Sequence, residues 1–200
     1  MRNRGGVVAA FANAYFEATG VPIVGVSCSQ GNTKISDWEP GTPKWKDLIN
    51  RLALCEDYLN SSDNFRIRHT YLVWCQGEAD ALTPYEDYYE SLKLFTNTLV
   101  SDTNVEAVFF IRIGNKSTEL DRNDTVMQVQ NDLCKNEKES VLISTRFAEF
   151  GVFDIMKDPQ HYTQYEYNLV GKEAGYNAAY YTLNGTQPRI YDYEFDNYYE

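Results

Sequence analysis

Residues 71–80 read YLVWCQGEAD, an apolar run that changes abruptly into a glutamine, a glycine and two carboxylates. The run 71–75 is typical of a buried strand. Ligands of open α/β sheets bind beyond the carboxyl ends of the strands, so the polar groups after this run would face a ligand instead of the core. This junction is therefore the first candidate site.

Helical and strand patterns alternate on both sides of this stretch, which is typical of a parallel sheet covered by helices. The expected strands are 22–28, 67–75, 105–113 and 140–144, and the expected helices are 7–18, 44–59, 83–99, 121–138 and 163–181. The sequence thus predicts the α/β class, a three-layer αβα sandwich with a parallel sheet, over residues 1–185. The acidic, tyrosine-rich tail 186–200 lacks periodicity, and we expect a surface strap there.

Length and composition limit the possible partners. The 200 residues, 43% of them apolar, suit one globular domain. The net charge of -11 disfavours a nucleic-acid partner, because such proteins use clustered Lys and Arg to replace counterions. The longest apolar runs fall far short of the roughly 20 residues that a membrane span needs, so no membrane partner is expected.

The start of the chain and its cysteines leave the cellular compartment open. The N-terminal segment has no small-residue cleavage site, so we expect no signal peptide in this chain. The default is then the cytoplasm, or secretion if an upstream segment precedes residue 1. The four cysteines have no C-x-x-C spacing and are expected to be buried free thiols: Cys28, Cys55, Cys75 and Cys134.

Three polar clusters follow elements of the predicted sheet: residues 30–33, residues 76–80, and Asp158 with His161. We expect them at one edge, where the carboxyl ends of parallel strands meet. Asp158 and His161 stand in D-x-x-H spacing ahead of a helix, so the carboxylate can accept from Nδ1 of the imidazole while Nε2 faces the cleft. This is the base and orienting half of a hydrolytic triad.

The W-x-Q-G-E-x-D motif of residues 74–80 resembles the third block of the SGNH hydrolases, in their sialate O-acetylesterase and acetylxylan esterase branch, carbohydrate esterase family six. Residues 24–38 are similar to the second block of that branch, and Asp158 with His161 match its last block. The likeness spans about residues 5–180. It implies a flavodoxin-like SGNH hydrolase fold. It also implies an enzyme that removes acetyl groups from sugars by a serine mechanism, without a cofactor.

The resemblance also assigns roles to residues. His161 would act as the base and Asp158 would orient it, while the backbone N–H of Gly31 and the side-chain amide of Gln76 would stabilise the oxyanion. Six residues are expected to line the carbohydrate site: Glu78, Asp80, Asn32, Thr33, Trp38 and Tyr162. No metal is expected, because hard cations need more convergent oxygens than Glu78, Asp80 and His161 offer.

The chain departs from the family pattern at its nucleophile. The family implies a serine in a G-Q-S-N-like block on a central strand ahead of helix 7–18, and this sequence has no such block. Ser27 and Ser29 fall where the second block belongs. A sheet cannot simply omit a central strand, because each unpaired buried backbone group costs about 1 to 3 kcal/mol.

Three explanations of the missing nucleophile strand remain open. We favour a C-terminal piece of a longer protein, in which Met1 is an internal methionine. The others are a second chain that supplies the strand, and a sheet that has closed up without activity. The predicted function is a carbohydrate O-acetyl esterase acting on sialate or xylan acetyl esters, inactive as this chain alone. The alternative is a non-catalytic carbohydrate-binding or interaction subunit that uses the same crevice.

Overall fold

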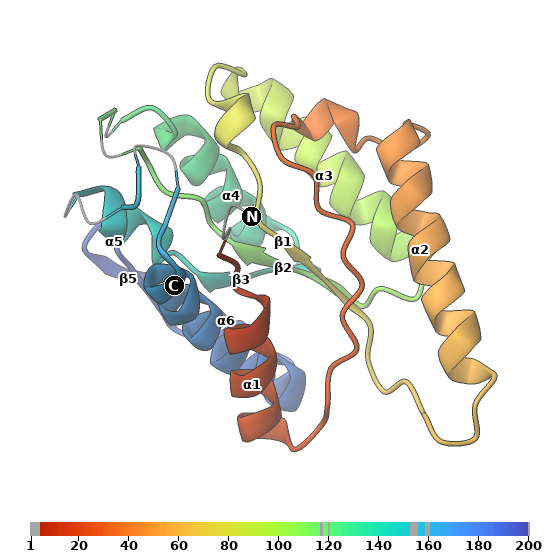
Figure 1. The fold of residues 1–200 in the computed structure, drawn as a ribbon. Coiled ribbons are helices and arrows are strands. Elements are labelled where there is room, and N and C mark those ends of the chain that lie inside the picture. Colours follow the sequence, from red (N-terminus) through yellow and green to blue (C-terminus); the bar gives the residue numbers. More distant parts are fainter. Residues whose placement is uncertain (1–4, 117, 120, 153–155, 159–160, 200) are drawn as a thin grey trace.

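A computed structural model describes residues 5–116, 118–119, 121–152, 156–158 and 161–199. Its centre is a parallel sheet in the order β1-β2-β3 (Figure 1). The three strands are β1 (Tyr71–Trp74), β2 (Ala107–Ile111) and β3 (Ser140–Ser144). The helices are α1 (Val8–Thr19), α2 (Pro43–Asn60), α3 (Tyr85–Asp102), α4 (Asp124–Asn136), α5 (Phe147–Val152) and α6 (Gln164–Asn184), with short 3-10 turns η1 (Ile35–Asp37) and η2 (Glu78–Asp80).

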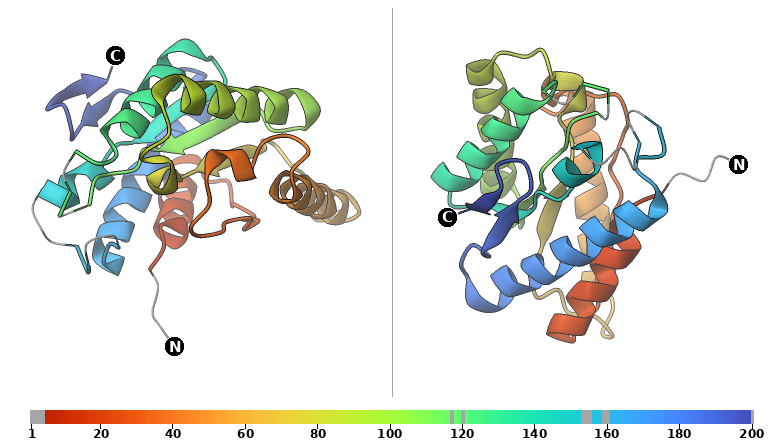
Figure 2. Two further views of the ribbon diagram at one scale, coloured as in Figure 1. Left: turned by 90° about the horizontal axis from the view of Figure 1, so that it is seen from above. Right: turned by 90° about the vertical axis from the view of Figure 1, so that its left-hand side faces the viewer.

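The helices form two layers around the sheet, which confirms the predicted α/β class (Figure 2). Helices α1 and α6 cover one face, and α2, α3 and α4 cover the other. Every residue of β2 and β3 is buried, so these strands read as continuous apolar runs instead of alternating ones. Within β2, Val108 and Phe110 enter the core under α3 and α4, while Phe109 enters the core under α6.

Local chemistry fixes the ends and the packing of the helices. The hydroxyl of Thr42 accepts from Trp45 N at the start of α2, and Thr163 caps α6 in the same way. Helices α1 and α6 approach closely at Gly171 and Gly175. A Cβ atom at Gly175 would lie 2.5 Å from Phe11 O, so only glycine permits this contact. The pair thereby forms a compact layer on one face of the sheet.

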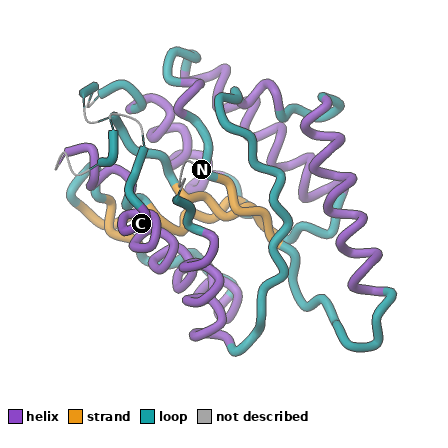
Figure 3. Tube along the Cα trace, in the orientation of Figure 1, coloured by secondary structure: helices purple, strands orange, loops and turns teal. Residues whose placement is uncertain are grey.

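The expected strand 22–28 is wrong. Residues 21–30 form a long loop without backbone–backbone hydrogen bonds among the described residues (Figure 3). A β-strand needs a hydrogen-bonded neighbour, and none of the described strands pairs with this segment. The apolar, β-branched composition is present, but without a partner strand it produces no ladder.

The C-terminal tail is also more ordered than the predicted surface strap. Strands β4 (Ile190–Asp192) and β5 (Asn197–Tyr199) form an antiparallel hairpin. Asp192 lies 2.6 Å from both Nη1 and Nη2 of the fully buried Arg112, in a bidentate ion pair. Ile190 and Tyr199 join the core under α4. The tail is therefore part of the packed structure.

All four cysteines are free, but only one matches the predicted burial. Cys134 is buried, Cys28 and Cys55 are half-buried, and Cys75 is exposed at the end of β1. None of the helices in the described part of the chain is long and apolar enough to cross a membrane.

Candidate active site

The chain turns sharply where β1 ends. Trp74, the last strand residue, packs edge-on against Trp38 with 5.8 Å between the ring centroids. Gly77 has a φ of 154°, and a Cβ atom there would lie 2.6 Å from Val126 Cγ1. Only glycine therefore allows the backbone to double back into η2 and keep the following carboxylates at the sheet edge.

Asp80 joins two loops at this edge. Its Oδ2 accepts from Ile35 N at 2.9 Å and from Gln76 Nε2 at 2.7 Å, and its Oδ1 accepts from Thr83 Oγ1 at 3.3 Å. The side chain is only 1% exposed. The prediction that Asp80 contacts the carbohydrate is therefore corrected: its carboxylate holds the site's loops in place.

Gln76 completes this connection. Its Nε2 donates to Thr33 O at 2.6 Å as well as to Asp80. Both protons of the amide are therefore engaged within the loops. In this arrangement Gln76 positions the loop 30–33 beside the end of β1, and its amide does not have the free N–H that the predicted oxyanion role requires.

The loop 30–33 exposes one backbone donor and buries one side chain. Gly31 and Asn32 are exposed, with Asn32 in the left-handed region at φ 60°. Gly31 N has no hydrogen-bond partner in the described part of the chain, so it is available to an oxyanion. Thr33 is buried: its hydroxyl donates to Gln30 O and accepts from Trp38 Nε1, each at 3.1 Å.

Two more of the predicted carbohydrate contacts are core residues. Trp38 is buried in the core under α2 and α3, and Tyr162 is buried in the core under α6. Tyr162 stacks on Phe147 with 4.3 Å between centroids. Thr33, Trp38 and Tyr162 therefore support the site from within, because their side chains have little surface left for a ligand.

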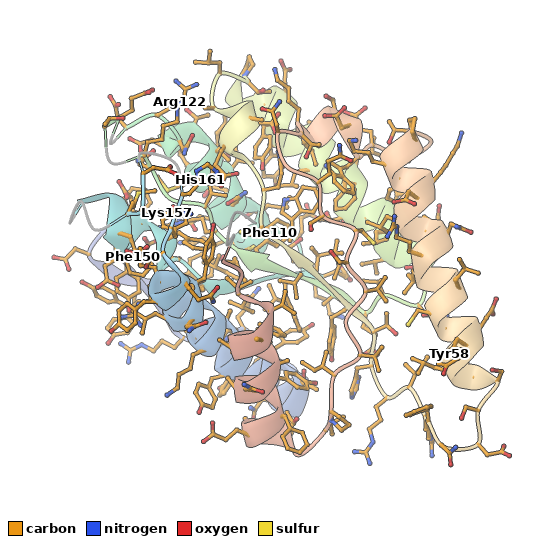
Figure 4. The ribbon with its side chains drawn as sticks, viewed as in Figure 1. Tyr58, Phe110, Arg122, Phe150, Lys157 and His161 are labelled. Carbon is orange, nitrogen blue, oxygen red and sulfur yellow. The ribbon has the colours of Figure 1, made fainter. Side chains whose placement is uncertain are left out.

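The third cluster lies on the loop ahead of α6, where Figure 4 labels His161. Nδ1 of His161 lies 2.8 Å from Oδ1 and 3.0 Å from Oδ2 of Asp158. Asp158 Oδ1 also accepts from the backbone N of His161 at 2.9 Å. Residues 159–160, between the two, lie outside the described residues. The carboxylate thus fixes the imidazole ring and its tautomer, which leaves Nε2 as the basic nitrogen.

Glu78 brings the second and third clusters together. It is exposed to solvent, yet desolvation by the surrounding protein raises the pKa of its carboxyl, while backbone hydrogen bonds and the charge of His161 act to lower that pKa. A side chain can be accessible at its surface while its carboxyl is partly desolvated by the protein around it. The electrostatic interaction with His161 places Glu78, beyond the end of β1, near the loop ahead of α6.

Cys75 lies near Glu78 and interacts with it electrostatically. Its side chain is exposed, yet desolvation raises the pKa of its thiol far above the ordinary value, and the charge of Glu78 adds to this. The thiol is thus strongly favoured over the thiolate. Cys75 does not replace the missing serine, because the thiolate is the nucleophilic form of cysteine.

Comparison with known proteins shows the family and the fold of the chain. The sequence profile described as carbohydrate esterase, sialic acid-specific acetylesterase, matches residues 2–178. The chain belongs to this carbohydrate esterase family. A crystal structure of a protein from Arabidopsis thaliana shares the fold, with a TM-score of 0.64 and 22% identity over 87% of this chain and 67% of that one. No curated protein matches the chain.

This member of the esterase family also has a supporting residue that the sequence analysis missed. Gln130 of α4 donates to Gln76 O at 2.7 Å and to Tyr88 Oη at 3.1 Å, and it accepts from Ile113 N at 3.2 Å. The one available signal was a glutamine among the apolar positions of a helix. The described residues contain no group of three or more His, Cys, Asp or Glu that could hold a metal.

Proposed function

We propose that this chain carries the base, the orienting carboxylate and an oxyanion donor of a carbohydrate O-acetylesterase, acting on acetyl esters of sialate or xylan. The supporting observation is the state of His161. Both oxygens of Asp158 lie within 3.0 Å of its Nδ1, while Nε2 has no hydrogen-bond partner in the described part of the chain. An imidazole held in this way can accept a proton at Nε2 from an attacking hydroxyl.

The reaction would proceed in two halves. A serine hydroxyl attacks the acetyl carbonyl as Nε2 of His161 takes its proton, and the N–H of Gly31 donates to the oxyanion. The intermediate collapses, the sugar oxygen leaves with the proton from His161, and an acetyl-serine remains. Water repeats the sequence and releases acetate. One oxyanion donor contributes about 2.7 to 4 kcal/mol to such a barrier.

The nucleophile is proposed to come from a strand other than β1, β2 and β3. Ser27 and Ser29 hydrogen-bond to each other at 3.2 Å, and neither is hydrogen-bonded to His161. We therefore expect residues 1–200 alone to hydrolyse esters no faster than a variant without the base.

The test uses p-nitrophenyl acetate and four proteins. These are the chain itself, the chain with a strand ending in Gly-Gln-Ser-Asn fused ahead of Gly5, and His161→Ala and His69→Ala in that fusion. His69 is a matched control, because it also pairs its Nδ1 with a carboxylate, Glu106, at 2.9 Å. We expect turnover only in the fusion, lowered about 100-fold or more by His161→Ala and unchanged by His69→Ala. A fusion that turns over equally well without His161 contradicts the proposal.

One observation favours a second candidate, a carbohydrate-binding subunit without catalysis. Within the described residues, the side chain of His161 is hydrogen-bonded to Asp158 and to no hydroxyl. Calorimetric titration with O-acetylated and deacetylated sugar distinguishes the two. Preferential binding of the acetylated sugar by the chain alone, with no turnover by the serine fusion, would support the binding role over the esterase.

A further inference from the structure

A pocket opens where the C-terminal tail packs against the end of α4. Its volume is about 410 Å³, and it is lined by six residues: Cys134, Lys135, Gln187, Pro188, Arg189 and Tyr199. The first two belong to the last turn of α4, and the others belong to the segment ahead of β4 and to β5. The hairpin of β4 and β5 lies beside α4 in both views of Figure 2. Ligand pockets have volumes of about 300 to 1,000 Å³, so this one can hold a small molecule.

The pocket lies at the edge of the sheet opposite to the candidate active site. Gln187 is hydrogen-bonded to Ser140, the first residue of β3, and it follows the end of α6, whereas His161 precedes the start of that helix. A helix of 21 residues is about 30 Å long, so the two sites are separated by this length. The family profile ends at residue 178, ahead of every tail residue that lines the pocket. The pocket is therefore distinct from the ester site.

Hydrogen bonds within the protein hold the tail side of the pocket in place. Gln187 Nε2 donates to Cys134 O at 3.1 Å and to Ser140 O at 2.8 Å. The hydroxyl of the buried Tyr199 donates to Asn131 O at 3.0 Å. A wall that is already ordered loses little conformational entropy when a ligand binds. Because both amide protons of Gln187 are used, its Oε1 remains as an acceptor for a ligand hydroxyl.

Two of the lining side chains are cations. Lys135 Nζ lies 5.1 Å from the ring centroid of Tyr199, and the guanidinium carbon of Arg189 lies 3.8 Å from the ring centroid of Tyr198. Both cations are exposed. In the part of the chain that the structure describes, neither is paired with a carboxylate. The aromatic rings hold the cations through their quadrupoles and leave their charge unneutralised.

The acidic side chains that are closest to these cations in sequence have other partners. Asp132 accepts from a tyrosine hydroxyl of α3 at 2.7 Å. Glu137 pairs with Lys93 Nζ at 2.6 Å, and Asp192 pairs with the buried Arg112. The whole chain has a net charge of -11, so a pocket with two unbalanced cations departs from its surroundings. Its charge favours an anionic ligand.

The end of α4 explains one of the two cations but not the other. Lys135 stands in the last turn of this helix, where a cation interacts favourably with the negative end of the helix dipole. That end is equivalent to about half a negative charge, so a single cation offsets it. Arg189 belongs to the tail, and its charge makes the pocket net positive.

We propose that this pocket binds an acidic sugar, a hydroxylated ring that bears a carboxylate or phosphate group. The acid group takes hydrogen bonds from Lys135 and from Arg189, whose guanidinium fork matches both kinds of anion. A ring hydroxyl donates to Gln187 Oε1, and the apolar face of the ring lies on Pro188 and Tyr199. A neutral sugar leaves the cations unpaired, and an inorganic anion leaves the amide oxygen and the apolar wall unused. Binding here is independent of the proposed ester chemistry.

The test is calorimetric titration of the chain with glucuronate, glucose 6-phosphate, glucose and inorganic phosphate. We expect an acidic sugar to bind about 10-fold or more tightly than glucose and inorganic phosphate, and the tighter of the two acidic sugars identifies the acid group. Lys135→Gln and Arg189→Gln should each weaken its binding about 10-fold. Lys172→Gln is the matched control and should leave the affinity unchanged. Lys172 is also exposed and lies 5.9 Å from a tyrosine ring centroid, that of Tyr176, but it does not line the pocket.

Backbone amide NMR locates the bound sugar. The tighter acidic sugar should shift the amides of Gln187, Arg189 and Tyr199 in the wild type, and not at the same concentration in Lys135→Gln. Four outcomes would overturn the inference: no binding of either acidic sugar, equal affinity for glucose, equal weakening in Lys135→Gln and Lys172→Gln, or shifts confined to Gly31 and His161 at the other edge. If the pocket binds the sugar but the serine fusion does not hydrolyse ester, the pocket stands and the proposed esterase function fails.

Discussion

Asp80 should be the carboxylate on which the candidate site depends most for its stability. Its two oxygens accept three hydrogen bonds, and replacing it by alanine leaves Ile35 N–H and the Gln76 amide without their acceptor in a buried place. The loops on either side of the site would then lose the group that joins them.

The size of the effect follows from the two short bonds. A hydrogen bond to a charged group contributes about 1.5 to 3 kcal/mol net, and the weaker bond from Thr83 at 3.3 Å adds little. The contributions of the bonds at 2.9 and 2.7 Å add, and the cost of desolvating the carboxylate is subtracted from their sum. Asp80→Ala should therefore lower the free energy of unfolding by about 3 to 5 kcal/mol. Asp80→Asn keeps one oxygen acceptor, so its free energy of unfolding should fall by about half as much as that of Asp80→Ala.

The assay is urea unfolding followed by tyrosine and tryptophan fluorescence, with free energies of unfolding taken at constant m. Asp37→Ala is the matched control. Asp37 also accepts a backbone bond, from Lys34 N at 2.9 Å, but it is exposed, so we expect a loss of about 1 kcal/mol or less. Equal losses for Asp80→Ala and Asp37→Ala would refute the reasoning, since burial of the acceptor would then have no consequence.

Three further predictions concern other parts of the molecule. Asp192→Asn leaves the buried Arg112 charge unbalanced and should lower the free energy of unfolding by about 3 to 5 kcal/mol. Burial alone would raise the pKa of Asp192, but Arg112 holds this pKa below the ordinary value. The stabilisation by the ion pair should therefore fall as the pH drops through the acid range, which unfolding between pH 3 and 7 measures. Burial raises the pKa of the Glu173 carboxyl to about 7, above its pKa in the unfolded chain. The ionised carboxyl therefore destabilises the fold increasingly as the pH rises from the unfolded-state pKa to about 7, and fully above that. Glu173→Gln should raise the Tm at pH 8 and have little effect at pH 4. Gly77→Ala should cost about 2 kcal/mol or more, because its Cβ would meet Val126 and its φ is unfavourable for alanine; a Tm equal to the wild type would exclude this clash.

The sequence predicts most of the layers because they depend on local periodicity. Apolar residues at helical spacing identify α2, α3, α4 and α6, and the apolar runs identify β2 and β3. The strand expected at 22–28 fails for a tertiary reason: its residues favour β structure, but a ladder also needs a hydrogen-bonded neighbour. The helix α5 and the hairpin of β4 and β5 are likewise fixed by what they pack against.

The candidate site likewise has a part that local sequence predicts and a part that depends on tertiary packing. The D-x-x-H spacing places Asp158 against His161 because three residues of a turn determine that geometry, and the structure has it. Burial is not visible in a motif. Trp38 and Tyr162 have side chains that could line a sugar site, but they pack in the two cores, and the carboxylate of Asp80 is used by neighbouring loops.

The central claim is that the end of β1 and the loop ahead of α6 lie side by side in one site, and the titration of Glu78 tests it most directly. Side-chain ¹³C NMR can follow the Glu78 carboxyl in the wild type, in His161→Ala and in the control His69→Ala. Desolvation raises the pKa of Glu78 and the positive charge of His161 lowers it, so we expect a higher Glu78 pKa in His161→Ala and no change in His69→Ala. A Glu78 pKa that is the same in all three proteins would place His161 away from Glu78 and contradict the claim that they share one site.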